Sequence, residues 1–226
     1  YTTLFRSASR WRDYENRPLC CMEEKYLRTA AHLLSIIFRP FYVPTVGFIA
    51  LFLFTYLGLL PMRYQVIIVG VVYLFTVVLP MLAIYFYQKV NGWSLRHLGH
   101  REKRIVPYAM TIASYVTCLL LMYRMGIPRF MSGILVSSLL AIVICALVNI
   151  WWKISVHMAA IGQFIGGMVS FSLLFYYDGV GWFCLAIIVA GLLGTSRIIL
   201  RQHSLSKVIV GFLVGLVCGI AGILFI

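Results

Sequence analysis

The C-terminal stretch "LSKVIVGFLVGLVCGIAGILFI", residues 205–226, is long and apolar enough to cross a membrane as one helix, because a spanning helix needs about 20 mostly apolar residues to cross roughly 30 Å of hydrocarbon. Glycines recur in it at every fourth position, at Gly211, Gly215 and Gly219. Small residues at this spacing let two membrane helices approach closely. The stretch therefore predicts a membrane helix that packs tightly against a neighbour.

Apolar runs of similar length fill most of the chain. The chain has 226 residues, of which 62% are hydrophobic and 11% charged, and its mean hydropathy of +0.97 lies far outside the soluble range. We expect an all-α, polytopic transmembrane helical bundle of six to seven spans. The runs occur at about 41–60, 65–88, 106–124, 130–151, 157–177, 181–196 and 205–226. The sixth run is short and Pro40, Pro44 and Pro80 fall in or beside the first two, so six spans plus a re-entrant segment is the alternative.

The fifth run also carries closely spaced glycines, at Gly162, Gly166 and Gly167. This pattern favours packing of the fifth run against the seventh. Such packing would bring His157 and His203 together.

The N-terminal residues 1–21 precede the first methionine, Met22, and contain no apolar core long enough for a cleavable signal peptide. We interpret residues 1–21 as an added, upstream or disordered extension. Residues 22–226 are expected to form a single transmembrane domain.

The basic residues are distributed unequally between the two sides of the membrane. The formal net charge is +13, from 19 lysines and arginines against 6 acidic residues. With seven spans, only Arg63, Arg124 and Arg129 fall on one side, and the other basic residues share the opposite side with every polar cluster. The positive-inside rule would make that side cytoplasmic, but many of the same residues are candidates for binding a substrate. We expect an integral protein of the bacterial inner membrane.

Cysteine and aromatic patterns argue against a metal centre and a nucleic-acid surface. Four cysteines lie inside apolar runs without CxxC or CxxH spacing, so we expect buried thiols, no disulfide framework and no metal site: Cys118, Cys145, Cys184 and Cys218. The aromatic residues gather near helix ends, as in an interfacial belt. We therefore expect the lipid bilayer, and no nucleic acid, as a partner.

Three polar clusters lie at the ends of predicted helices on the shared side: "RHLGHREKRIVP" (96–107), "WWKISVHMAAIG" (151–162) and "SRIILRQHSLSK" (196–207). Ionisable groups near membrane depth are costly, so their convergence indicates a site. Fixed cations with two histidines suit phosphoryl transfer, in which one imidazole attacks and the other protonates the leaving oxygen. Of the six acidic residues, only Glu102 lies in a cluster, so neither a metal nor another cofactor is expected.

Two of these clusters carry a recognisable pattern. Ser155-Val156-His157, followed by Ser196-Arg197-x5-His203, resembles the second and third signatures of the type 2 phosphatidic acid phosphatase superfamily, which read Ser-Gly-His and Ser-Arg-x5-His-x3-Asp. The resemblance covers roughly residues 89–215.

The resemblance implies a role for each matching residue. His203 would be the nucleophile that forms a phosphohistidine, and His157 the general acid for the leaving alkoxide. Arg197 and Ser155 would bind the phosphoryl oxygens, assisted by the positive end of the helix that begins at 156. The further candidates for binding the substrate phosphate are Arg101, Lys103, Arg104, Lys153, Ser196 and Lys207.

The sequence departs from the family pattern in three places. The first signature, Lys-x6-Arg-Pro, has only the partial match Arg101-x2-Arg104-x2-Pro107 in this region, and Val156 replaces the glycine of the second. Lys207 stands where the family has an aspartate that orients the nucleophile. Lysine cannot accept that hydrogen bond while charged. Either another acceptor such as Ser206, Glu102 or a backbone carbonyl orients His203, or activity is low, or Lys207 binds phosphate.

The function implied is that of a membrane lipid phosphatase, a metal-independent hydrolase of phosphate monoesters or diphosphates. Candidate substrates are a phosphatidate, a phosphatidylglycerol phosphate, a polyprenyl diphosphate or a lipid A phosphate. Two alternatives remain: a lipid phosphotransferase of the same superfamily, and a non-catalytic lipid-binding or transport relative. The oligomeric state and the leaflet that the site faces stay open.

Overall fold

The computed structural model describes residues 26, 29–35, 38–90, 102–152, 154–176 and 179–224, apart from the side chains of 88, 90 and 102–105. The extension expected at residues 1–21 lies outside this part. Within it, seven helices are long and apolar enough to cross a membrane, and no strand occurs. The prediction of an all-α bundle of membrane-spanning helices is confirmed, with seven spans.

The helical elements follow one another with short connections. They are η1 (Pro40–Tyr42), α3 (Val43–Phe54), η2 (Tyr56–Leu59), α4 (Met62–Tyr73), the π-helical turn η3 (Leu74–Val78), α5 (Leu79–Val90), α6 (Glu102–Arg124), α7 (Arg129–Trp151), α8 (Val156–Phe175), α9 (Val180–Ile199) and α10 (Leu205–Leu224). α4, η3 and α5 together form one span, Met62–Tyr87.

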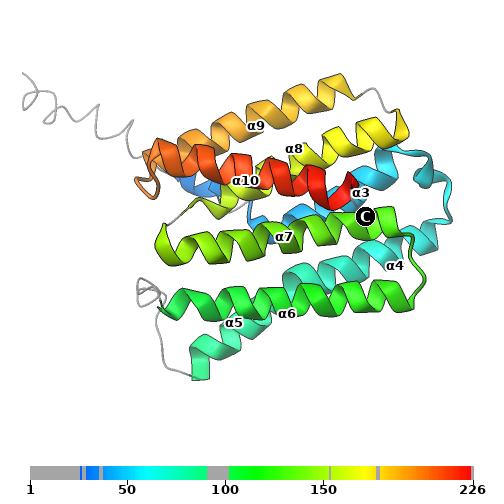
Figure 1. Ribbon diagram of the computed structural model, residues 1–226, viewed down its shortest axis with the longest axis horizontal. Helices are drawn as coiled ribbons and strands as arrows, with labels where there is room; N and C mark the ends of the chain where they lie inside the picture. The colour runs from blue at the N-terminus through cyan, green and yellow to red at the C-terminus, as the bar shows by residue number, and fades with distance from the viewer. Residues whose placement is uncertain are drawn as a thin grey trace, which may run out of the picture.

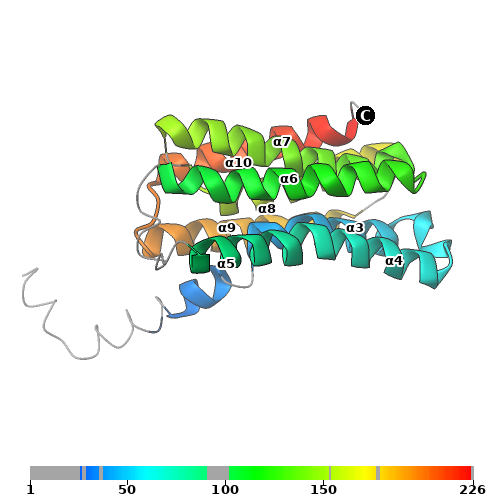
Figure 2. The same ribbon diagram turned by 90° about the horizontal axis from the view of Figure 1, so that it is seen from below.

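The spans run side by side and alternate in direction. In Figure 1 the α7–α8 and α9–α10 connections lie at the same end of the bundle as the start of α6. The α3–α4, α6–α7 and α8–α9 connections lie at the opposite end. Figure 2 shows α8 between a layer of α6, α7 and α10 and a layer of α3, α4, α5 and α9. The start of α8 is therefore surrounded by other elements at the end that carries the predicted site.

The first span differs from its predicted bounds. It extends over Thr29–Phe54 instead of 41–60. Pro40 opens η1 and Pro44 lies in the first turn of α3, where a missing N–H costs little. After Phe54, Thr55 adopts extended backbone and its hydroxyl accepts a hydrogen bond from the N–H of Leu57, so the helix ends there.

The sixth run forms a complete span. α9 covers Val180–Ile199 and crosses the bundle as a helix of 20 residues, so the alternative of six spans plus a re-entrant segment is wrong. Ser196 and Arg197 therefore lie in the last turn of a helix, whereas the sequence places Arg197 in a loop.

The buried cysteines follow the prediction with one exception. Cys118, Cys145 and Cys218 are buried free thiols. Cys184 is exposed, because it lies on a face of α9 that no described helix covers. The prediction that all four are buried is wrong for this residue.

The contact between α8 and α10 is made by backbone. A Cβ atom added to Gly215 would overlap the carbonyl oxygen of Ala159, and one added to Gly162 would overlap the carbonyl oxygen of Phe212. The same is true of Gly219 against Gln163. The predicted close packing of the fifth and seventh runs is confirmed.

We expect Gly215→Ala to lower the melting temperature of the protein in detergent. Alanine normally favours a helix over glycine by about 1 kcal/mol, but here its methyl group has no room, and overpacking costs roughly 1–3 kcal/mol. Gly191 of α9 has open space around its Cβ position, so Gly191→Ala should leave the melting temperature unchanged or slightly raised. Equal shifts in the two variants would contradict the close contact.

Candidate functional site

Four predicted site residues meet at one end of the bundle, where α8, α9 and α10 come together. Ser155 directly precedes α8 and His157 lies in its first turn. Arg197 lies in the last turn of α9, and His203 lies in the turn before α10. His157 interacts electrostatically with both Arg197 and His203. The packing of α8 on α10 thus places His157 and His203 close enough to interact electrostatically.

Ser155 is held against the start of α10 by its backbone. Its N–H donates to the carbonyl oxygen of Lys207 at 3.3 Å. A Cβ on Gly211 would lie 2.7 Å from the carbonyl oxygen of Ser155, so only glycine fits at that position. The contact fixes the first turn of α8 next to the turn that carries His203.

The hydroxyl of Ser155 is available for a ligand. The residue is 0% exposed, and its Oγ has no hydrogen-bond partner among the described residues. Serine at this position usually caps the helix with its side chain, but this hydroxyl makes no cap hydrogen bond. A buried polar group left unpaired costs roughly 1–3 kcal/mol. Together with the positive end of α8, the free hydroxyl favours binding of an anion.

Arg197 supplies a buried positive charge to the same place. It is 5% exposed, and its Nη1 donates to the side-chain oxygen of Gln202. This partner is neutral, so the contact orients the guanidinium without neutralising it. The Nε–H has no acceptor in the part of the chain that the structure describes. An arginine presents donors in a planar fork that matches phosphate oxygens, and this one retains an unused donor.

The turn between α9 and α10 changes the expected relation of His203 to Lys207. α10 begins at Leu205, so His203 lies before the helix and Lys207 lies in its first turn. The two residues therefore do not lie one turn apart on a single helix, as a continuous helix over 203–207 would place them. Ser206, a candidate to orient His203, is exposed and its Oγ lies 3.4 Å from that of Ser204.

The other predicted phosphate-binding residues are placed less favourably or lie outside the described part. The hydroxyl of Ser196 donates to the carbonyl oxygen of Leu193 at 2.7 Å, within its own helix, so its proton is already used. Arg101 and Lys153 fall outside the described residues, as do the side chains of Glu102, Lys103 and Arg104 at the start of α6.

Two residues of the first span reach the site and are absent from the predicted set. The backbone of Ser35 forms a hydrogen bond with His157, and Arg39 interacts with His157 electrostatically. The Oγ of Ser35 is buried without a partner among the described residues. Pro40 holds the preceding Arg39 in extended backbone, with φ −71° and ψ 141°, as expected before proline.

A sequence signal for Arg39 exists outside the region of the resemblance. Arg39-Pro40 is an Arg-Pro pair of the kind that ends the family's first signature. The position seven residues before Arg39 holds His32 where the signature has lysine. The pair lies far upstream of 89–215, where the incomplete match Arg101-x2-Arg104-x2-Pro107 occurs.

Comparisons with known proteins add no family assignment. No protein-family model, no curated protein and no solved structure matches the chain. The resemblance to the type 2 phosphatidic acid phosphatases stays a prediction based on the motif residues.

We expect inorganic phosphate to raise the melting temperature of the wild-type protein, because a ligand that binds only the folded state stabilises it. Arg197→Ala should weaken phosphate binding at least about tenfold, since a charged hydrogen bond contributes roughly 1.5–3 kcal/mol. Arg201 is the matched control: it lies in the adjacent turn, exposed, with φ 50°. Arg201→Asn, which keeps the left-handed backbone, should bind phosphate as the wild type does. Loss of binding in both variants would indicate a diffuse charge effect.

Arg39→Gln should weaken phosphate binding by a smaller factor, about two- to fivefold, because the Arg39 side chain is exposed and exposed charges interact weakly. This loss of phosphate affinity should be smaller at high salt, because salt screens exposed charges. Arg129→Gln, at the opposite end of the bundle, is the control in the same titration. If Arg39→Gln binds phosphate with the affinity of the wild type, Arg39 does not belong to the site.

Proposed function

We propose that this protein is a membrane lipid phosphatase that removes phosphate from a lipid monoester or diphosphate through a phosphohistidine intermediate, without a metal. The observation that supports it best is the pair of buried, unpartnered polar atoms, Ser155 Oγ and Arg197 Nε, beside His157 and His203. Buried polar groups are normally satisfied. The hydroxyl of Ser155 and the Nε–H of Arg197 can donate hydrogen bonds to a ligand next to the two histidines. This arrangement suits a tetrahedral, negatively charged group such as phosphate.

The proposed reaction has two steps. In the first, an imidazole nitrogen of His203 attacks phosphorus, the bond from phosphorus to the lipid oxygen breaks, and His157 gives a proton to that oxygen, releasing the alcohol or the lipid monophosphate. In the second, His157 takes a proton from water, the water oxygen attacks phosphorus, and the phosphorus–nitrogen bond breaks to release phosphate. Arg197 and Ser155 stabilise the charge on the phosphoryl oxygens in both steps.

The lipid nature of the substrate is supported by the level of the site in the bundle. The cluster lies at the ends of three helices that are each long enough to span a membrane. Trp151 and Trp152 are exposed at the end of α7, next to the start of α8. Tryptophans at helix ends are typical of the headgroup level of a bilayer. A headgroup can reach the site from this level while its chains stay in hydrocarbon, and we propose the bacterial inner membrane as the location.

We expect phosphate release from a panel of lipid phosphates in detergent to fall at least about a hundredfold in His203→Ala and in His157→Ala, in line with the contribution of a nucleophile or a general acid. Chelator should have no effect. Arg201→Asn should retain wild-type turnover. With substrate radiolabelled in its phosphate group, quenching in alkaline detergent, which preserves the acid-labile phosphorus–nitrogen bond, should trap label on the wild type and none on His203→Ala.

The same experiment separates the alternatives. Label transferred to a second lipid, with no free phosphate, would identify a phosphotransferase. Binding of lipid phosphate without turnover would identify a lipid-binding protein. Full activity of both histidine variants would overturn the assignment of the site, and loss of activity with chelator would overturn the metal-free mechanism.

A further inference from the structure

A cavity of about 290 Å³ begins beside the polar cluster and runs into the bundle between η1, α6, α7 and α8. Its rim includes Pro40, the neighbour of Arg39, and Val156, which lies between Ser155 and His157. Its volume is close to the lower end of ligand-binding pockets, roughly 300–1,000 Å³. The cavity and the proposed phosphate site are therefore adjacent.

The cavity follows one face of α8 toward the middle of the membrane. Val156, Ala159, Ala160 and Gln163 line it, and this spacing places four side chains on one stripe of a helix. The stripe extends about 10 Å along the helix axis, at roughly 1.5 Å per residue. Most of the remaining lining side chains are apolar or aromatic: Phe41, Pro107, Tyr108, Tyr115, Ala141, Ile142 and Cys145.

Gln163 closes the inner end of this cavity. It is buried, and its Nε2 donates to Ser138 Oγ at 2.6 Å and to Ser137 Oγ at 3.1 Å. Both serine hydroxyls donate to the carbonyl oxygen of Ile134, so they accept from the amide, and the serine protons and the amide nitrogen all take part in hydrogen bonds. Separating these groups would leave unpaired polar atoms at membrane depth, which is costly. The side chains of Gln163, Ser137 and Ser138 therefore form a polar floor, by which we mean a hydrogen-bonded polar layer at the inner end of the cavity.

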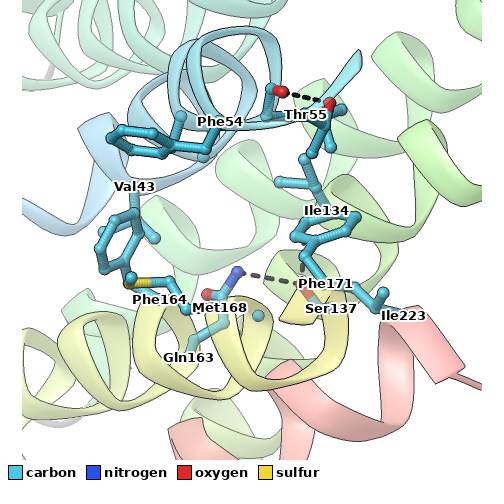
Figure 3. A pocket seen from close by; sticks show the side chains of 14 residues that line it. Val43, Phe54, Thr55, Ile134, Ser137, Gln163, Phe164, Met168, Phe171 and Ile223 are labelled. Carbon is cyan, nitrogen blue, oxygen red and sulfur yellow. Dashed lines mark hydrogen bonds between the residues drawn. The ribbon is translucent and has the colours of Figure 1, made fainter. Parts of the chain in front are cut away.

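A second, smaller cavity of about 60 Å³ lies on the other side of Gln163. Gln163 lines both cavities, while Ser138 lines the larger and Ser137 the smaller. Figure 3 shows the amide of Gln163 directed at Ser137, with Phe164, Met168 and Phe171 around the smaller cavity. Removing the Gln163 side chain would connect the two spaces.

We propose that the larger cavity holds one hydrocarbon chain of the phosphorylated lipid, and that Gln163 limits the length of chain that fits. This inference rests on the proposed function and adds a chain specificity to it. An anionic group at Arg197 and Ser155 would place the first methylenes of an attached chain at the rim. The apolar walls suit a chain, the volume suits one chain rather than two, and the polar floor opposes further penetration.

We expect Gln163→Ala to raise the ratio of kcat/KM for dioleoyl over dioctanoyl phosphatidate at least about threefold relative to the wild type, because it joins the two cavities. Gln163→Leu removes the hydrogen bonds but keeps a side chain of similar size, so the ratio should stay within about twofold. A glutamine that only links α8 to α7 would give lower melting temperatures in both variants and no change in the ratio. That result would overturn the role of Gln163.

Filling the cavity tests the chain site separately. Ala141 of α7 lines the cavity and is buried, away from the histidines. Ala141→Phe should lower kcat/KM for both phosphatidates at least about tenfold, yet keep the melting-temperature shift caused by inorganic phosphate. Unchanged kcat/KM, or equal loss of phosphate binding, would overturn the chain site.

A photoreactive phosphatidate with a diazirine in mid-chain provides a readout that does not need turnover. We expect labelling of α6 and α7 at Tyr115 and Ile142, reduced in Ala141→Phe. Labelling there without phosphate release would support the chain site and reject the phosphatase. Phosphate release with labelling only on outward faces would reject the chain site and keep the phosphatase. Measuring kcat/KM for farnesyl phosphate in the same assay tests whether the cavity takes a prenyl chain rather than an acyl chain.

Discussion

The contact on which the structure depends is the one between α8 and α10, where two helices meet through backbone atoms. Lipid tails are as apolar as the helix surfaces, so membrane helices gain stability from close packing rather than from burial away from water. Gly162, Gly215 and Gly219 provide this packing, because any larger side chain would overlap the opposite backbone. The same contact sets the distance between the start of α8 and the turn before α10, and therefore the geometry of the candidate site.

A rigid frame of this kind explains how buried polar atoms can stay unpaired. The hydroxyls of Ser35 and Ser155 and the Nε of Arg197 have no partners within the described residues. In a looser structure these side chains would rotate toward a neighbouring carbonyl, as Ser196 does toward Leu193. Close packing denies them that freedom, and groups held ready for a ligand in this way reduce the reorganisation that binding requires.

Much of the fold could be predicted from the sequence, because apolar runs and glycine spacing are local signals. The pairing of α8 with α10 followed from the glycines alone. The start of the first span could not be predicted, because basic and proline residues interrupt its apolar pattern around Arg39 and Pro40. The full length of α9 was also hidden, since the sequence places Arg197 in a loop although it continues the helix.

The site could be predicted only in part for a similar reason. Ser155, His157, Arg197 and His203 form short motifs within 89–215, whereas Arg39 belongs to an Arg-Pro pair far upstream of that region and reaches them only through tertiary packing. The cavity beside them has no sequence signal either, because it is bounded by ordinary side chains from four elements. The polar floor at Gln163 depends on two serines of α7, a pairing between runs that no spacing rule indicates.

The break in the first span at Arg39 and Pro40 has a consequence for biogenesis. This segment leaves the ribosome before the residues that it meets, His157 and its neighbours on α9 and α10, are synthesised. Until α8 inserts, Arg39 and Ser35 cannot interact with His157. The site thus forms only after α10 has been made, from segments far apart in the sequence, so that a nascent bundle without α8, α9 and α10 exposes a basic helix end to the membrane surface without holding a formed binding site.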